Sequence, residues 1–531
     1  MQQRGWPCLA QQQDIRALAA FRILSGLYLL YDIIERLQYG RLSLLWYTST
    51  DNSFLRPDDT PHRSPIHRFW FYRGSENVQI FLFVVTFLLS LSFMLGYKCN
   101  AFSKTLLWLN VVAMQCRCMP PHDGSDTFIR HLLLWSIQLP MSQVWSLDSV
   151  YQQNMLKKRT DKRNIDYCDI QNVVAVWGLR LQIVIMYLGT VIHRTYDSYG
   201  FEIYKSKWLP PQLTAVHYAL HQSLGSRDSW LCNFVRNNLP ASQFMTLTGM
   251  LIETFAPIMS LIMGNKAHIP AFFLFKLHFG LYVLMNLPNW QFVGMIASVV
   301  WLPSWFWNNM QKNLALRFPN VFAPPTVYLS PELMEKKDGV SEAERKKNSV
   351  RDATIKVQRR RRPYVTYFLF SYMLYDFVGN RNWFRKFDNG DIGEGIRFSQ
   401  YWVMFSEPSS NTKQVMLTGT LNDKENVNVW EWMKSHGANI ETVDLEEFQI
   451  YVWTNMTHVF PSPRIERAFS EWPSASEAKS KHFLRSFCNE TPFSYLKLTV
   501  QSCYTMPPGS EERYSSPWAT VVDADCDYRS Q

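Results

Sequence analysis

Residues 78–97 read VQIFLFVVTFLLSLSFMLGY, an apolar run that contains no charged residue. A helix needs about 20 such residues to cross the roughly 30 Å hydrocarbon core of a bilayer, so this run predicts a transmembrane helix. Similar runs occur at 241–263, 269–286 and 289–307, and shorter or charge-bearing runs at 15–37, 104–118, 128–141, 173–193 and 364–379. We therefore predict an all-α polytopic membrane bundle of about eight or nine transmembrane helices. The run 364–379 decides the number, because its Asp376 also suits an interfacial helix lying on the membrane.

The composition also favours a membrane protein. Aromatic residues make up 15% of the 531 residues and charged residues 18%, whereas about 25% of the residues of an average soluble protein are charged. The nine cysteines include no C-x2-C pair with partner ligands, and His217 and His221 have no third ligand at a fixed spacing, so we predict no metal site. Nothing resembles a nucleic-acid reader, and the expected partner is the lipid membrane rather than nucleic acid.

The distribution of positive charge predicts the orientation in the membrane. With nine spans and a cytoplasmic N-terminus, the cytoplasmic connections carry 21 Lys and Arg residues and the loops on the opposite side carry 10, as the positive-inside rule expects. Residues 380–531 then lie in a lumen or outside the cell. The sequons at Asn455 and Asn489 both fall in that region, so we expect glycosylation there. The protein is expected to be multi-pass, in the endoplasmic reticulum or another endomembrane.

Four segments are predicted along the chain. Residues 1–310 form the transmembrane helical domain, 311–362 a basic cytosolic linker, and 363–379 the final span or an interfacial helix. Residues 380–531 form a small β-rich α/β extramembrane domain, of ordinary size for one domain.

Alternating apolar and polar residues predict the elements of this small domain. Strands are expected at 397–405, 414–421, 447–455 and 495–506, and a helix at 464–489. A disulfide between Cys488 and Cys503 is expected if that side of the membrane is oxidising, with Cys526 left over.

Ionisable residues inside the apolar runs are the candidates for a site, since each is costly in a membrane unless it is paired or hydrated. We expect a polar bundle interior formed by Arg22, Asp32, Arg180, Glu253 and His278; Lys276 also interrupts its run. Glu253 is expected to pair with Arg180 or His278. Two interpretations are open: a ligand-binding cavity, or interhelical ion pairs that fix the packing of the bundle.

Several motifs, in order along the chain, resemble the horizontally transferred transmembrane (HTTM) domain. They begin with ALAAFRILSGLYLLYDIIER (17–36), and the most specific is GSDTFIRHLLLWSIQLPMSQVWSLD (124–148). ETFAP (253–257), LHFGLYVLMNLPNW (277–290), WLPSWFW (301–307) and RFSQYWVMFSEP (397–408) follow. The chain is thus identified as similar to the superfamily that includes the vitamin K-dependent γ-glutamyl carboxylases.

The resemblance also implies where catalysis would occur. In the carboxylases, a lysine at the end of the fifth span removes a proton from reduced vitamin K. The matching stretch here is YLGTVIHRTYDSYG (187–200), with His193 and Arg194 at the two lysine positions. Arginine stays protonated in proteins, so Arg194 cannot be that base. His193 is the remaining catalytic candidate, although it lies about 100° away from Arg194 around a helix.

The sequence therefore predicts a protein that resembles the carboxylases but does not carboxylate glutamate. It would bind a lipophilic molecule in the polar interior of the bundle, without an established cofactor. The first alternative is an active γ-glutamyl carboxylase and epoxidase that uses reduced vitamin K or another quinone. The second alternative is a transporter, which the lack of inverted repeats disfavours.

Overall fold

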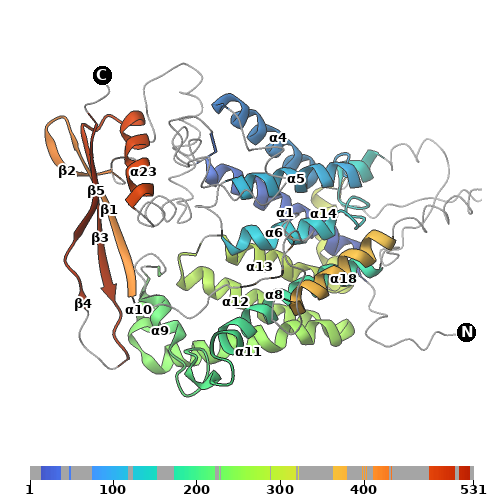
Figure 1. Ribbon diagram of the computed structural model, residues 1–531. Helices are drawn as coiled ribbons and strands as arrows, with labels where there is room; N and C mark the ends of the chain where they lie inside the picture. The colour runs from blue at the N-terminus through green and yellow to red at the C-terminus, as the bar shows by residue number, and fades with distance from the viewer. Residues whose placement is uncertain are drawn as a thin grey trace, which may run out of the picture.

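A computed structural model provides the fold (Figure 1). It describes residues 13–37, 47–48, 75–117, 123–151, 173–221, 226–227, 229–287, 289–318, 321, 363–379, 398, 400, 402, 411–429, 432, 477–508 and 514–526. A bundle of helices occupies most of the molecule, and a small β-sheet lies at one end of it (Figure 1).

Five helices in the described ranges are long and apolar enough to cross a membrane. Three of them are α1 (Ile15–Arg36), α4 (Glu76–Leu95) and α8 (Val173–Ile192), which continues through a π-helical turn at His193–Asp197. The other two are α11 (Leu239–Ile262) and α12 (His268–Leu284), the latter preceded by a short turn at Gly264–Lys266. The structure therefore supports a multi-pass membrane protein.

The four remaining predicted spans are helical but shorter than the roughly 20 residues that cross a bilayer core. They correspond to α5 (Ala101–Arg117), α6 (Gly124–Ser136), α13 (Trp290–Ser298) and α18 (Pro363–Gly379). The run 289–307 is divided because a 3-10 turn at Val299–Trp301 and Pro303 separate α13 from α14 (Ser304–Arg317). Five of the nine predicted spans are therefore helices of membrane length among the described residues, and the expected count of eight or nine transmembrane helices is not confirmed.

The burial of each helix shows its place in the bundle. In the most apolar 18-residue stretch of α1, 72% of the residues are buried. This helix therefore lies at the centre of the bundle, against α4 and α13. In the corresponding stretches of α4, α11 and α12, only 28–33% of the residues are buried. Each of these three helices exposes apolar side chains such as Phe81, Phe255 and Phe272. Such faces suit contact with lipid, because lipid is as apolar as they are.

Local sequence features set the ends of the helices. Asp123 and Asp126 form a capping box at the start of α6, in which each side chain accepts from the other residue's backbone N–H. Gly96 ends α4 in the left-handed conformation at φ +66°. A β-carbon at this glycine would also collide with the guanidinium of Arg22.

The small domain is an antiparallel sheet in the order β2-β1-β3-β4, with β5 also paired to β3. Its strands are β1 (Asn411–Leu421), β2 (Lys424–Asn428), β3 (Tyr495–Tyr504), β4 (Tyr514–Ser515) and β5 (Ala519–Asp525). Asn422 and Asp423 connect β1 to β2, and both have the positive φ that a two-residue hairpin turn needs. Helix α23 (Glu477–Glu490) lies along the sheet (Figure 1). Its Phe483 and Phe487 belong to the same apolar core as Leu417, Leu496 and Leu498.

Two of the strands predicted in this domain are confirmed, at 414–421 and 495–506. The described part of the helix predicted at 464–489 is helical, as α23, whereas residues 464–476 and the strand predicted at 447–455 lie outside the described residues. The strand predicted at 397–405 is wrong at its described positions. Phe398, Gln400 and Trp402 there are buried and not in a strand. Phe398 and Trp402 belong to the bundle core, because their rings pack against aromatic side chains of α6 and α18 and are thereby removed from water.

Candidate functional site

A buried ion pair connects the end of α8 to the middle of α11. Both terminal nitrogens of the Arg194 guanidinium, Nη1 and Nη2, donate to the carboxylate of Glu253. The contact from Nη2 to Oε1 is 3.5 Å, and the one from Nη1 to Oε2 is closer. The ring of Trp208 lies 4.1 Å from the centre of the guanidinium. Arg194 and Glu253 are both buried. The charge on Arg194 is therefore neutralised by a carboxylate and covered by an indole.

The backbone around this pair departs from regular α-helix on both sides. Arg194 lies in the π-helical turn His193–Asp197, a feature often found at functional sites. Its carbonyl oxygen accepts a hydrogen bond of 2.9 Å from the hydroxyl of Ser206. On the other helix, Pro257 lacks the N–H that would bond the carbonyl of Glu253 one turn earlier. Both irregularities lie next to the ion pair.

A second polar pair lies beside the first. The hydroxyl of Tyr187 in α8 is 2.5 Å from Nε2 of His278 in α12. Glu253 is close enough to Tyr187 for the two to interact electrostatically. These four residues, Tyr187, Arg194, Glu253 and His278, form what we call the interior polar site, built from α8, α11 and α12.

Within the part of the chain that the structure describes, the other ring nitrogen of His278 has no hydrogen-bond partner. Its Nδ1 is buried, and the side chain as a whole is only 1% exposed. In a neutral imidazole, Nδ1 is either a donor or an acceptor, and in both cases one buried polar group is left unsatisfied. Such a group is uncommon in a folded protein and calls for a physical explanation.

Steric space around His278 is created by one glycine. A β-carbon added at Gly294 in α13 would lie 2.2 Å from Cε1 and Nε2 of the imidazole. The ring of Trp290, one turn earlier, is 5.8 Å from the His278 ring. The imidazole is thus held between a tyrosine hydroxyl, an indole and a bare backbone.

The remaining residues of the predicted polar interior lie in other surroundings. Arg22 donates to the carbonyls of Met141 and Trp145, at 2.7 and 2.5 Å, and so attaches α1 to the turn after α6. Arg180 donates to the side chain of Gln13 at 2.9 Å. Both arginines are buried and serve as donors to backbone or amide oxygens.

Asp32 belongs to a separate ionic cluster. Arg36 donates to Asp32 at 3.0 Å and to Asp126 at 2.6 Å, and all three side chains are at most 1% exposed. The prediction that Glu253 pairs with Arg180 or His278 is therefore wrong. The carboxylate of Glu253 pairs with Arg194 instead. Arg194 lies in the π-helical turn and packs against Trp208. Of the predicted interior residues, only Glu253 and His278 share a site.

The two catalytic candidates differ in their surroundings. Arg194 is buried, whereas the His193 side chain is 15% exposed at the end of the span. Nδ1 of His193 is 3.9 Å from a carboxylate oxygen of Asp197, one turn later. The two neighbouring residues therefore face different environments.

Sequence reasoning missed Tyr187. Arg180, Tyr187 and Arg194 are each seven residues apart, a spacing that places three polar residues on one face of an apolar helix. This stripe of polar residues was the feature of the sequence that could have identified Tyr187. It indicates the face of α8 that is turned inward, although not the partner of each residue.

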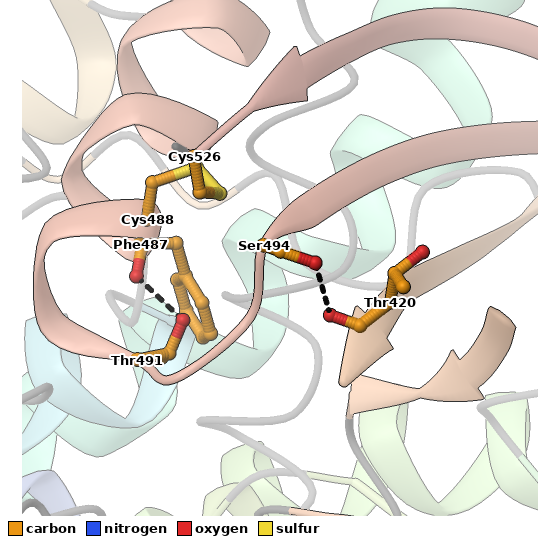
Figure 2. Close-up of a disulfide and its surroundings, with 6 residues drawn as sticks. All are labelled: Thr420, Phe487, Cys488, Thr491, Ser494 and Cys526. Atoms are coloured by element: carbon orange, nitrogen blue, oxygen red, sulfur yellow. Dashed lines mark hydrogen bonds between the residues drawn. A yellow bond between two sulfur atoms is a disulfide. The ribbon is translucent and has the colours of Figure 1, made fainter. Parts of the chain in front are cut away.

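The small domain contains a disulfide between Cys488 in α23 and Cys526 after β5 (Figure 2). The expected pairing of Cys488 with Cys503 is therefore wrong. Thr491 also donates to the carbonyl of Phe487, and Ser494 to that of Thr420, beside the bridge. The disulfide thus attaches the C-terminal end of α23 covalently to the residue that follows β5.

Of the two predicted glycosylation sites, Asn489 is exposed near the end of α23. Asn455 lies outside the described residues. The rings of His217 and His221 lie side by side, with centroids 4.3 Å apart and an angle of 48° between their planes. In the described part of the chain, no three His, Cys, Asp or Glu side chains gather in a way that could hold a metal ion.

No protein-family model, curated protein or solved structure matches this chain. The function of the interior polar site is therefore inferred from its own chemistry.

Proposed function

We propose that this protein is a multi-pass membrane protein of the HTTM type that binds a lipophilic molecule at the interior polar site and does not carboxylate glutamate. The expected ligand is largely apolar and carries a hydroxyl or carbonyl oxygen. Such a molecule would reach the site from the bilayer, and its oxygen would bond the polar groups there.

The observation that carries this proposal is the unpartnered Nδ1 of His278 inside an apolar bundle. A buried polar group without a partner is unfavourable. A hydrogen bond from this nitrogen to a ligand oxygen therefore contributes more binding free energy than the same bond would in water. The adjacent Tyr187 hydroxyl already bonds the other ring nitrogen, and this contact fixes the plane of the imidazole. The histidine is thus oriented before a ligand arrives, which lowers the entropy lost on binding.

Arg194 is unsuited to the proton removal that carboxylation requires. A general base must spend part of its time deprotonated near the working pH. Arginine does not meet this condition. In addition, the guanidinium is occupied by the carboxylate of Glu253. These properties suit a structural ion pair beside a binding site rather than proton removal.

Mass spectrometry of lipophilic molecules that co-purify with the protein tests the proposal. Tyr187→Phe and His278→Phe keep the size of each ring and remove its polar group. We expect a compound enriched in the wild-type protein to be lost from both variants. The matched control is His221→Phe, because His221 directly follows α9 (Ala215–Leu220) and lies outside the five membrane-length helices. Identical extracts from all four proteins would refute the proposal.

A second candidate function is favoured by one contact. His193 lies 3.9 Å from Asp197, and a carboxylate beside an imidazole is an arrangement used in general-base catalysis. The assay is incorporation of labelled bicarbonate into a Glu-rich peptide, with reduced vitamin K and purified protein. Incorporation above background that disappears in His193→Ala would establish this activity and replace the first proposal. We expect none.

The C-terminal domain is proposed to lie on the lumenal side of an endomembrane such as the endoplasmic reticulum. The Cys488–Cys526 disulfide supports an oxidising environment. The charge distribution of the loops supports the same orientation. In sealed, cytosol-side-out microsomes, an epitope after residue 531 should be protected from protease. Its digestion would place the domain in the cytosol.

A further inference from the structure

Lys276 lies well inside a membrane-length helix and outside the interior polar site. The apolar helical stretch Gly264–Leu284 contains it. At a rise of about 1.5 Å per residue, it is about 18 Å from the first residue of that stretch and about 12 Å from the last. Both distances exceed the reach of a four-carbon side chain. The ammonium group therefore cannot extend to water beyond either end of the stretch.

The side chain of Lys276 is on the outer surface of the bundle. It is exposed, whereas His278, two residues later, is buried against Tyr187. Its immediate neighbours are Phe272 and Phe279, which are 55% and 45% exposed. The ammonium nitrogen is 5.2 Å from the centre of the Phe272 ring and 5.9 Å from that of Phe279. A cation thus stands between two aromatic rings on a face that would otherwise meet lipid.

No carboxylate of the described chain neutralises this cation. Lys276 makes no salt bridge with any described residue, and its two aromatic contacts give only part of the stabilisation that an anion would. Charged residues within membrane spans almost always pair with another group, and they mark functional positions. The position therefore lacks a counter-ion among the described residues.

A second copy of this chain does not supply that counter-ion from the middle of its described spans. Asp32, Glu35, Asp126, Glu253 and Asp376 are all buried within the bundle. Glu76 and Asp197 are not buried, but they stand at the very ends of their spans, away from the depth of Lys276. Two copies that met through the same face would also bring two lysines together. A lipid headgroup is excluded by depth, because it would have to enter the hydrocarbon region.

We propose that the outer face of α11 and α12 around Lys276 binds a transmembrane helix of a different protein, and that this helix carries an aspartate or glutamate at the depth of Lys276. The exposed apolar residues of these two helices, such as Phe255 in α11 and Phe272 and Phe279 in α12, would pack against the apolar part of that helix. The ion pair would then form in hydrocarbon, where it selects a partner with the opposite charge.

The test uses full-length protein in phosphatidylcholine vesicles and synthetic leucine–alanine transmembrane peptides. The peptides are identical except for a central Glu, Gln, Leu or Lys. A photo-crosslinking phenylalanine analogue replaces Phe279, next to Lys276. The same analogue at Phe81 serves as the control, since Phe81 is 63% exposed on α4.

We expect the Glu peptide to crosslink at position 279 about tenfold more than the Leu peptide, and at position 81 no more than the Leu peptide. Lys276→Leu should remove the advantage of the Glu peptide. Lys276→Glu should transfer it to the Lys peptide. Melting temperatures of both variants equal to that of the wild type show that the fold is kept, since residue 276 lies on the surface.

Equal crosslinking of the Glu and Leu peptides at position 279 would overturn the proposal. Crosslinking of the Glu peptide that persists in Lys276→Leu would do so as well. A crosslinked dimer of the protein itself, formed through position 279 without peptide, would assign the face to a second copy instead.

Discussion

The ion pair between Arg194 and Glu253 gives a quantitative test of how the interior polar site is built. Glu253→Gln keeps the size of the side chain and removes its charge. The guanidinium of Arg194, whose side chain is 1% exposed, would then be left in the bundle without a counter-ion. Removing one partner of a buried ion pair costs about 3–5 kcal/mol, since the other charge stays buried without compensation.

The melting temperature of the detergent-solubilised protein measures this loss. A loss of stability of that size lowers the melting temperature by on the order of 5–10 °C in a large domain. The double variant Arg194→Met with Glu253→Gln removes both charges, so it should recover most of the lost stability. The matched control is Glu202→Gln, which breaks a pair with Lys205 whose two side chains are at least half exposed. We expect no measurable change there, because water replaces the partner.

Two results would contradict this reasoning. An unchanged melting temperature in Glu253→Gln would mean that Arg194 is solvated or has another counter-ion. A double variant less stable than Glu253→Gln would mean that Arg194 stabilises the bundle through packing on Trp208 rather than through its charge.

Three further predictions follow from other contacts. Gly294→Ala should displace the His278 imidazole, lowering the melting temperature by several degrees and reducing co-purified ligand. Gly280→Ala, whose added β-carbon meets nothing within 4 Å, should do neither. Replacing Cys488 and Cys526 by serine should destabilise the small domain by about 3–4 kcal/mol, because a loop of 38 residues is released; peptide mapping under non-reducing conditions should find the bridge intact in Cys503→Ser. Burial lowers the pKa of His217 from its ordinary value of 6.5, although a backbone contact with Met506 partly opposes this shift. Below about pH 6.5 the unfolded chain therefore binds more protons at this position than the folded one, so stability should fall as the pH is lowered. A melting temperature in His217→Phe that depends on pH between 7.5 and 5.5 as steeply as the wild type's would contradict the assignment.

Contacts between distant residues explain where sequence-based expectations were wrong. Glu253 was expected beside Arg180 or His278, yet its partner is Arg194, 59 residues earlier in the chain. Helical periodicity indicates the buried face of each span, but it does not indicate which helix lies against that face. The choice of Cys526 rather than Cys503 has a similar cause, because the packing of α23 on the sheet decides which cysteine is near.

The sequence by itself determined the class of the protein. An uncharged apolar run such as 78–97 has few alternatives to a membrane span, since the hydrocarbon core requires both its length and its composition. The strands at 414–421 and 495–506 were also local features, set by residues that alternate between two faces of a sheet. Only the tertiary structure decided how the charges are distributed. Arg22 and Asp32 lie in separate clusters, Arg194 is neutralised by Glu253, and Lys276 is left on the outer face. The physical reason is that burial and pairing depend on the positions of several helices at once, and a single helical pattern contains no information on its neighbours.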